Sequence, residues 1–226
     1  MPSRASRRGH RAHVSRTVTG LLVVVLLVGV ASLVVRARDG GSSEPTRPAP
    51  RPTASATPVT ALDLTGLVVH REPFCALLEA PRVRAALAGR VRGIAHYGSG
   101  QRVAMADGLR DVSHEFDCTF RGAGAQARAW VFAAPVDAAY ATRLARDARR
   151  GTGCRRLTAT PRYGDPTVST RCRDGRFLTV ALRGRFGNAW LACSLRAPVG
   201  KGSATPTDVV RRGRRWCVDV ARAAAG

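Results

Sequence analysis

TVSTRCRDGRFLTVALRGRFGNAWLACSL, residues 167–195, is the stretch of this sequence that decides the fold. The dipeptides Asp174-Gly175 and Gly187-Asn188 favour tight turns between antiparallel strands. On either side of these turns apolar and polar residues alternate, which is the period of a half-buried strand. The stretch therefore predicts three strands, at Thr167–Cys172, Arg176–Arg183 and Ala189–Leu195.

Strand spacing also occurs nearer the N-terminus. Phe116, Cys118 and Phe120 alternate with polar neighbours, and a Gly-Ala-Gly turn then leads into a second strand at 127–133. The weakly periodic stretch 90–108 is expected to be mostly loop. Carboxylates beside or within the first of these strands, among them Asp117, are interpreted as surface charge rather than as acid–base groups.

Three helices are expected around the strands. Apolar residues recur at helical spacing from about Phe74 and again after Pro135. The last helix follows Thr205-Pro206-Thr207-Asp208, which resembles a capping box with Pro at the first helical position. The sequence thus predicts an α+β fold: an antiparallel sheet with helices packed on one side, stapled by disulfides and preceded by one transmembrane helix.

The expected transmembrane helix is the run of residues 17–35, which contains no charged residue and is long enough to cross a bilayer. Arginines are concentrated before it, so the positive-inside rule predicts a cytoplasmic basic tail, residues 1–16, and an extracytoplasmic remainder. A cleaved signal peptide is the rival interpretation, although the run exceeds the usual apolar core of about 7–15 residues. We expect a single-pass protein of the cell membrane.

Residues 36–62 are expected to form a disordered linker. Pro, Ser, Thr, Gly and Ala dominate there, and such a composition cannot bury enough apolar surface to fold. Globular composition begins after it. The sequence therefore predicts a folded extracytoplasmic domain at 63–226.

The six cysteines all lie in that domain, at positions 75, 118, 154, 172, 193 and 217. Their even number in an oxidising compartment predicts three disulfides. No CxxC pair supports a zinc or redox site. Cys154 and Cys172 are the favoured pair because they bracket a short loop. Cys75–Cys118 and Cys193–Cys217 are the next expected pairs, and other pairings remain open.

Short motifs link the domain to a known group. A cysteine starts a Leu-Leu helix that ends in Leu-x-Gly at Cys75–Gly89, and a strand cysteine precedes an aromatic at Cys118-Thr-Phe120. Trp216-Cys217 stands in the closing helix. These motifs resemble actinobacterial cell-envelope domains of unknown function, over most of residues 70–224. The resemblance implies an envelope location and an α+β fold, and it brings no catalytic residues. Members of that family are usually lipid-anchored or secreted.

The chain carries a formal net charge of +22. The candidate anion-binding residues are the arginines beside the apolar stripe of the last helix: Arg211, Arg212, Arg214 and Arg215. Arginine binds phosphate and carboxylate in a bidentate manner, while a merely solvated helix face is the alternative. His114-Glu115 begins like a zinc-protease motif but lacks the second histidine. We predict no catalytic residue, metal or cofactor.

These observations favour a non-catalytic module of the bacterial cell envelope. It would bind or sense an anionic wall polymer, lipid headgroups or a partner protein. Nucleic acid is not expected as a partner, because the basic domain is predicted to lie outside the cell. The alternative is an envelope-acting hydrolase whose active site the sequence does not reveal.

Overall fold

The structure is a computed structural model that describes residues 57–104 and 109–226. The predicted cytoplasmic tail, the predicted transmembrane helix and most of the predicted linker lie outside the described residues. Within the described ranges, no helix is both long and apolar enough to cross a membrane. The first element is a short 3-10 helix, η1 (Val59–Ala61), which lies before the predicted domain boundary at residue 63.

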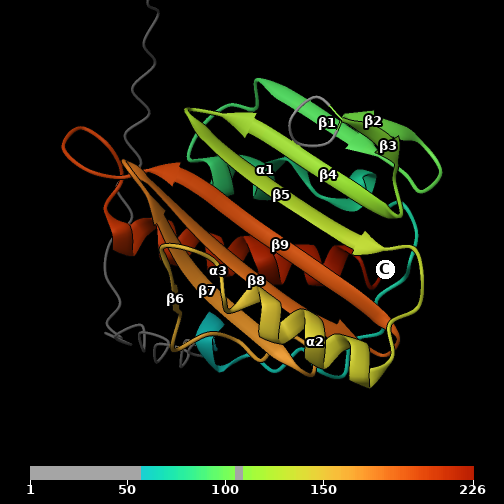
Figure 1. Cartoon of the computed structure of the whole chain (residues 1–226). Coiled ribbons are helices and arrows are strands. Elements are labelled where there is room, and N and C mark those ends of the chain that lie inside the picture. Colours follow the sequence, from blue (N-terminus) through green and yellow to red (C-terminus); the bar gives the residue numbers. More distant parts are fainter. Residues whose placement is uncertain (1–56, 105–108) are drawn as a thin grey trace, which may run out of the picture. The chain divides into compact units, whose positions relative to one another are not determined.

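A seven-stranded antiparallel sheet forms the centre of the domain (Figure 1). Its strand order is β1-β4-β5-β9-β8-β7-β6. The strands are β1 (Gly93–Tyr97), β4 (Glu115–Gly122), β5 (Ala125–Phe132), β6 (Cys154–Arg156), β7 (Thr167–Asp174), β8 (Phe177–Phe186) and β9 (Ala189–Pro198). The large antiparallel sheet predicted from the sequence is therefore confirmed.

The three strands predicted in residues 167–195 are β7, β8 and β9, and they are neighbours in the sheet. Asp174 pairs with Phe177 across the first turn, and Phe186 pairs with Ala189 across the second. Gly175 and Gly187 have φ angles of 53° and 62° in these turns. Glycine adopts such positive φ angles without steric cost, so both residues suit two-residue hairpin loops.

The stretch 90–108, predicted to be mostly loop, contains two strands. One is β1, at the edge of the large sheet, and the other is β2 (Arg102–Ala104), which pairs with β3 (Arg110–Val112) in a separate ribbon. The prediction was wrong here because no residue of β1 or β2 is fully buried. Such edge strands lack the alternating apolar pattern that marks a half-buried strand.

Helices α1 (Ala80–Leu87) and α3 (Pro206–Ala223) pack together on one face of the sheet. Figure 1 shows both behind the strands. The predicted cap of α3 is confirmed, since the backbone N–H of Asp208 donates to Thr205 Oγ1 at 3.1 Å. Trp216, Cys217 and Val220 of α3 are buried in the main hydrophobic core. The predicted packing of helices on one side of the sheet is confirmed for α1 and α3.

Helix α2 (Ala138–Ala148) starts at Asp137, whose side chain accepts a hydrogen bond from the backbone N–H of Tyr140 at 2.6 Å. It covers β7 and β8 in front of the sheet in Figure 1. Its buried residues belong to a second, smaller core, which includes Val168 of β7 and Trp190 of β9. This helix is thus separate from the face that α1 and α3 share.

Three disulfides staple the domain, as predicted, and they join the predicted pairs. Cys75–Cys118 ties the short 3-10 helix η2 (Cys75–Leu77) to β4, Cys154–Cys172 ties β6 to β7, and Cys193–Cys217 ties β9 to α3. Disulfides form and persist in oxidising compartments. The three bridges therefore suggest an extracytoplasmic or secreted domain.

Candidate functional site

One side of α3 packs against the core, and arginines lie on its exposed side. Gly213, Trp216 and Val220 pack inward. With 3.6 residues per turn, the positions 211, 215 and 222 fall on one outward stripe. All three are arginines. α1 lies alongside this stripe and adds Arg82.

Two adjoining pockets between α1, α3 and the start of the domain share Arg82, Arg215 and Asp219 in their linings. Their volumes are about 260 and 400 Å3. Together they hold five arginines and one carboxylate. We call these arginines the arginine cluster: Arg82, Arg211, Arg212, Arg215 and Arg222. Thr57, Val59 and Leu62 line the second pocket, so the described domain begins beside the cluster.

Two members of the cluster are partly neutralised by nearby acids. Arg211 donates to Asp208 Oδ1 at 2.7 Å in an exposed pair. The Arg82 guanidinium lies 3.5 Å from Glu79 and 4.0 Å from Asp219. The Arg211–Asp208 and Arg82–Glu79 pairs are exposed, and exposed pairs contribute about 1 kcal/mol or less, so they hold these side chains only loosely. Both arginines therefore remain able to bind an incoming anion.

Arg212 has a structural role as well. Its Nη1 donates to the carbonyl of Ala86 at 2.7 Å, in the last turn of α1, where carbonyls lack partners within the helix. Burial lowers the pKa of Arg212, because the charged guanidinium loses water. Arg215 and Arg222 have no side-chain hydrogen bond or ion pair within residues 57–104 and 109–226. These two are the most available donors of the cluster.

Asp219 lies at the centre of the cluster and is partly buried. Burial raises its pKa, although Arg82, Arg222 and Arg215 oppose that shift. The desolvation of the carboxylate is thus larger than its attraction to the surrounding arginines. One acidic group at the centre therefore offsets the positive charge incompletely.

Three of the four predicted anion-binding residues meet in this cluster, and Arg214 does not. Its Nη2 donates to the carbonyl of Thr158 at 2.8 Å, on the other side of α3. Burial lowers the pKa of Arg214 too. Arg214 thus braces the loop after β6. Arg82 and Arg222 were missed by the sequence analysis, although the spacing of Arg222 from Arg211 and Arg215 on a helix was a usable signal.

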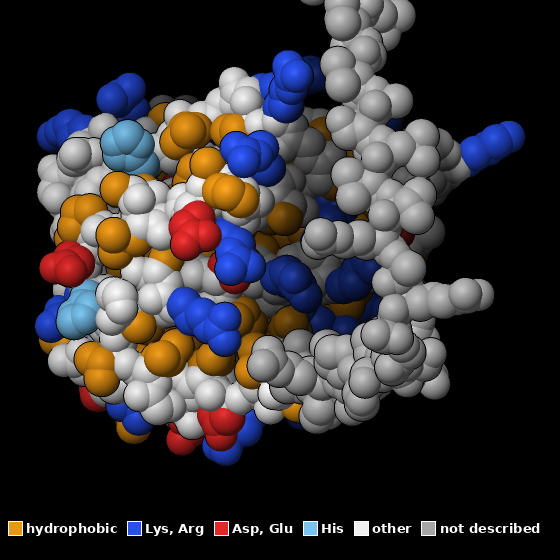
Figure 2. Space-filling model, turned by 180° about the vertical axis from the view of Figure 1, so that it is seen from behind, with side chains coloured by type: hydrophobic (Ala, Val, Ile, Leu, Met, Phe, Trp, Pro, Cys, Tyr) orange, Lys and Arg blue, Asp and Glu red, His pale blue; other side chains and the backbone are white. Residues whose placement is uncertain are grey.

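Figure 2 shows the face that α1 and α3 cover. Lys and Arg side chains gather near its middle, next to exposed hydrophobic side chains. The other arginine pairs of the sequence, Arg149-Arg150 and Arg155-Arg156, lie at the end of α2 and in β6. They are exposed and line none of the pockets described here. The arginine cluster is therefore distinguished by its concave setting as well as by its charge.

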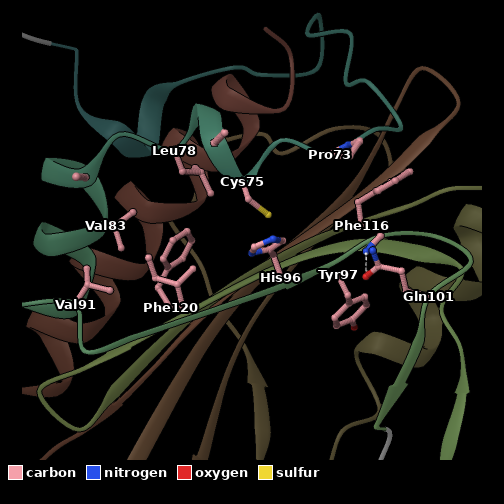
Figure 3. A pocket seen from close by; sticks show the side chains of 14 residues that line it. Pro73, Cys75, Leu78, Val83, Val91, His96, Tyr97, Gln101, Phe116 and Phe120 are labelled. Carbon is pink, nitrogen blue, oxygen red and sulfur yellow. Dashed lines mark hydrogen bonds between the residues drawn. The ribbon is translucent and has the colours of Figure 1, made fainter.

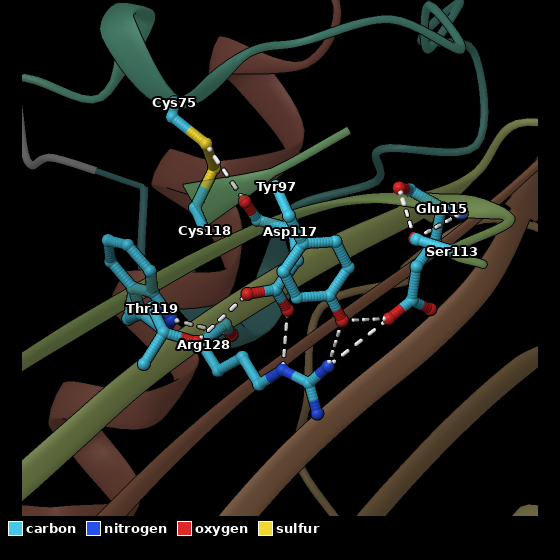
Figure 4. Close-up of polar contacts among 9 residues, drawn as sticks. Cys75, Tyr97, Ser113, Glu115, Asp117, Cys118, Thr119 and Arg128 are labelled. Atoms are coloured by element: carbon cyan, nitrogen blue, oxygen red, sulfur yellow. Dashed lines mark hydrogen bonds and ion pairs between the residues drawn. A yellow bond between two sulfur atoms is a disulfide. The ribbon is translucent and has the colours of Figure 1, made fainter. Parts of the chain in front are cut away.

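A polar network on the opposite face of the sheet is the other concentration of charge (Figure 4). Arg128 of β5 pairs with Asp117 and Glu115 of β4, and its Nη2 donates to Tyr97 Oη at 2.9 Å. Asp117 is only 2% exposed, so its interpretation as surface charge was wrong. Asp117 stands between Tyr97 of β1 and Trp130 of β5 in the register of the sheet, and these large neighbours explain the burial.

This network is satisfied by its own members. Tyr97 also donates to Glu115, and Thr119 donates to Asp117 at 3.0 Å. Burial, and then the bond to Glu115, raise the pKa of Tyr97 far above its usual range. Arg128 further stacks on Trp130, 4.7 Å from the ring centroid. Groups held in this way stabilise a sheet. No cluster of potential metal ligands occurs among the described residues.

Comparison with known proteins does not assign this chain to a family. No family model matches the chain, and no curated protein matches it. Among solved structures, a GTP-binding regulator from Thermotoga maritima aligns at 11% identity with a TM-score of 0.29. That alignment covers 66% of this chain and 93% of the other. So low a TM-score carries no argument about fold or function.

Proposed function

We propose that this chain is a membrane-anchored, extracytoplasmic and non-catalytic module of the bacterial cell envelope, which binds an anionic envelope component at the arginine cluster. The observation that supports it most is the meeting of five arginines around one carboxylate in two adjoining pockets. The three disulfides support the oxidising compartment.

The geometry of the arginine cluster fits an anion-binding site better than it fits a solvated helix face. Guanidinium groups offer paired N–H donors that match the oxygens of phosphate and carboxylate. Arg215 and Arg222 are not engaged by other described side chains. Arg211 is held by an exposed pair, and Arg82 is held by an exposed pair with Glu79 and by a 4.0 Å contact with the partly buried Asp219. An anion entering the pockets would therefore replace water and weak ion pairs rather than a buried network.

The predicted anchor would bring the cluster close to the membrane. The described domain begins at Thr57, which lines one of the two pockets. On the predicted linker, residues 36–56 would have a root-mean-square reach of about 25 Å if they behave as a flexible chain. The cluster would then be held near anionic lipid headgroups and wall polymers at a high effective concentration.

The test is binding of the full-length protein, in discs of zwitterionic lipid, to vesicles of anionic lipid and to purified anionic wall polymer. Binding is measured across a salt series. We expect it to weaken steeply with salt, because exposed charges are screened over about 8 Å at physiological ionic strength. The variant R82Q/R211Q/R215Q should lose affinity by roughly 1 kcal/mol per arginine at low salt.

The matched control is R149Q/R155Q/R156Q, which removes the same charge from α2 and β6. It should bind almost as well as the unchanged protein. Equal losses in the two triple variants would mean that net charge alone attracts the anion and that the arginine cluster is not a site. Absence of binding at low salt would end the proposal altogether.

A further inference from the structure

An apolar cavity of about 570 Å3 lies on the same face of the domain as the arginine cluster. Residues of η2 and α1 form one wall, and residues of β1 and β4 form the other. Figure 3 shows Val83, Val91 and Phe120 together at one end and Gln101 at the other. His96 lies between these ends, below Cys75. We call this pocket the apolar cavity.

The lining of the apolar cavity is dominated by carbon. His96 and Gln101 are its main polar groups, and Gln101 already accepts a hydrogen bond from the backbone N–H of Gly98 at 3.1 Å. Its volume falls within the range of small-molecule sites, about 300–1,000 Å3. Ile94 lines the cavity and remains 63% exposed. Large apolar side chains around an open cavity are typical of a site for an apolar ligand.

The linings of the apolar cavity and of the arginine cluster have no residue in common, but each shares residues with one further pocket. Leu78 lines the cavity and also a neighbouring pocket of about 230 Å3 that contains Arg82 and Arg222. On α1, Val83 faces the cavity whereas Arg82 faces the cluster. Glu79 and Asp219 also line this neighbouring pocket, so two acids lie close to Arg82 and Arg222.

We infer that the apolar cavity takes the alkyl chain of an anionic amphiphile whose phosphate or carboxylate head group is bound at Arg82 and Arg222. The inference rests on the proposed function and gives its ligand a chemical class. A long chain gains free energy by leaving water, and the adjoining guanidinium groups bind the head group in a bidentate manner. The apolar cavity thus complements the alkyl chain of the amphiphile, and the neighbouring pocket with Arg82 and Arg222 complements its head group.

The probe is a series of n-alkyl phosphates, used below their micelle concentration. The full-length protein is cut within residues 36–56 after purification, so that the folded domain is titrated without detergent or lipid. Affinity should rise about tenfold for every two methylene groups, until the cavity is filled. The n-alkanol of equal length and inorganic phosphate should each bind more weakly than the alkyl phosphate.

Two variants remove the chain site without touching the core. Ile94→Asp places a charge at the cavity, and Ala76→Trp fills part of it; both residues are exposed. Each variant should abolish the dependence on chain length. Val68→Asp is the matched control, since Val68 is 67% exposed and lines none of the pockets described here. Thermal unfolding checks that each variant is folded.

Glu79→Gln tests the head group. Glu79 is exposed beside Arg82, and its removal should tighten binding of the alkyl phosphate while leaving the alkanol unchanged. Affinity that is independent of chain length, with anionic polymer still bound, would overturn this inference and leave the proposed function intact. Equal binding of alkanol and alkyl phosphate would overturn the head-group assignment. If no anion of any kind binds, both proposals fall.

Discussion

At the residue scale, Asp117 shows how strongly one buried carboxylate can depend on its partner. It is 2% exposed, and it pairs with Arg128, whose side chain is 36% exposed. Losing one partner of a buried pair leaves the other charge desolvated, but the partial exposure of Arg128 lets water screen part of that cost.

Asp117→Asn should therefore lower the free energy of unfolding by about 1–3 kcal/mol in urea denaturation. The control is Asp147→Asn, which breaks the Asp147–Arg150 pair on α2. Both side chains of that pair are at least 70% exposed. This second variant should stay within about 0.5 kcal/mol of the unchanged protein. Equal effects in the two variants would contradict the role of the Arg128 network.

Asp219 gives a prediction with a defined sign. Burial raises its pKa in the folded domain, so the folded state binds the proton more tightly than the unfolded state does. Its contribution to stability is then complete below the unfolded pKa of about 3.9 and is lost as the pH rises through the folded value.

Asp219→Asn should remove that loss, so the variant should be at least as stable as the unchanged protein at pH 7. It should also bind anions more tightly there, since the acid inside the arginine cluster is gone. Denaturant titrations and anion titrations at pH 4 and pH 7 measure both effects. A variant that is less stable at pH 7 would show that the ion pair with Arg82 outweighs the burial.

At the scale of elements, Gly213 sets how closely α3 approaches β8. A Cβ atom at this position would lie 2.8 Å from Val180 Cβ. Gly213→Ala should destabilise the domain by about 1–3 kcal/mol, although alanine favours helices by about 1 kcal/mol. Gly66→Ala is the control because its Cβ would meet open space. Urea denaturation compares the two; a stabilised Gly213→Ala would show that α3 can shift away from the sheet.

The elements also show how far the sequence alone could lead. Turn dipeptides and the alternation of apolar and polar residues predicted β7, β8 and β9, because short turns join these neighbouring strands and the sheet buries much of their surface. β1 and β2 were not predicted, because these edge strands lack the alternation of apolar and polar residues. Three arginines of the cluster, Arg211, Arg212 and Arg215 of α3, were predicted, but Arg222 of the same helix and Arg82 of α1 were not. The place of Arg82 beside α3 depends on the packing of α1, and no spacing within one helix can reveal that packing.

At the scale of the whole molecule, the anchor remains a prediction. Protease added to intact, wall-stripped cells should remove the domain and leave the first residues protected, because the positive-inside rule places residues 1–16 in the cytoplasm. Mass spectrometry of the protected fragment reads the result. A mature protein that begins near Ser32 or Arg38 would instead establish a cleaved signal peptide. That outcome would leave the domain and its pockets unchanged.

The first described segment, residues 57–74, has a mechanical consequence for a tethered domain. Leu64 N–H donates to the Arg162 carbonyl at 2.9 Å, and His70 N–H donates to the Ala224 carbonyl at 2.8 Å. A force applied at Thr57 would load these bonds before it reached Cys75, which is covalently joined to β4. The bridged loops, with sequence separations of 43, 18 and 24 residues, cannot lengthen under load. Pulling would therefore release a short strap, after which the sulfur–sulfur bonds would bear the tension and limit further extension.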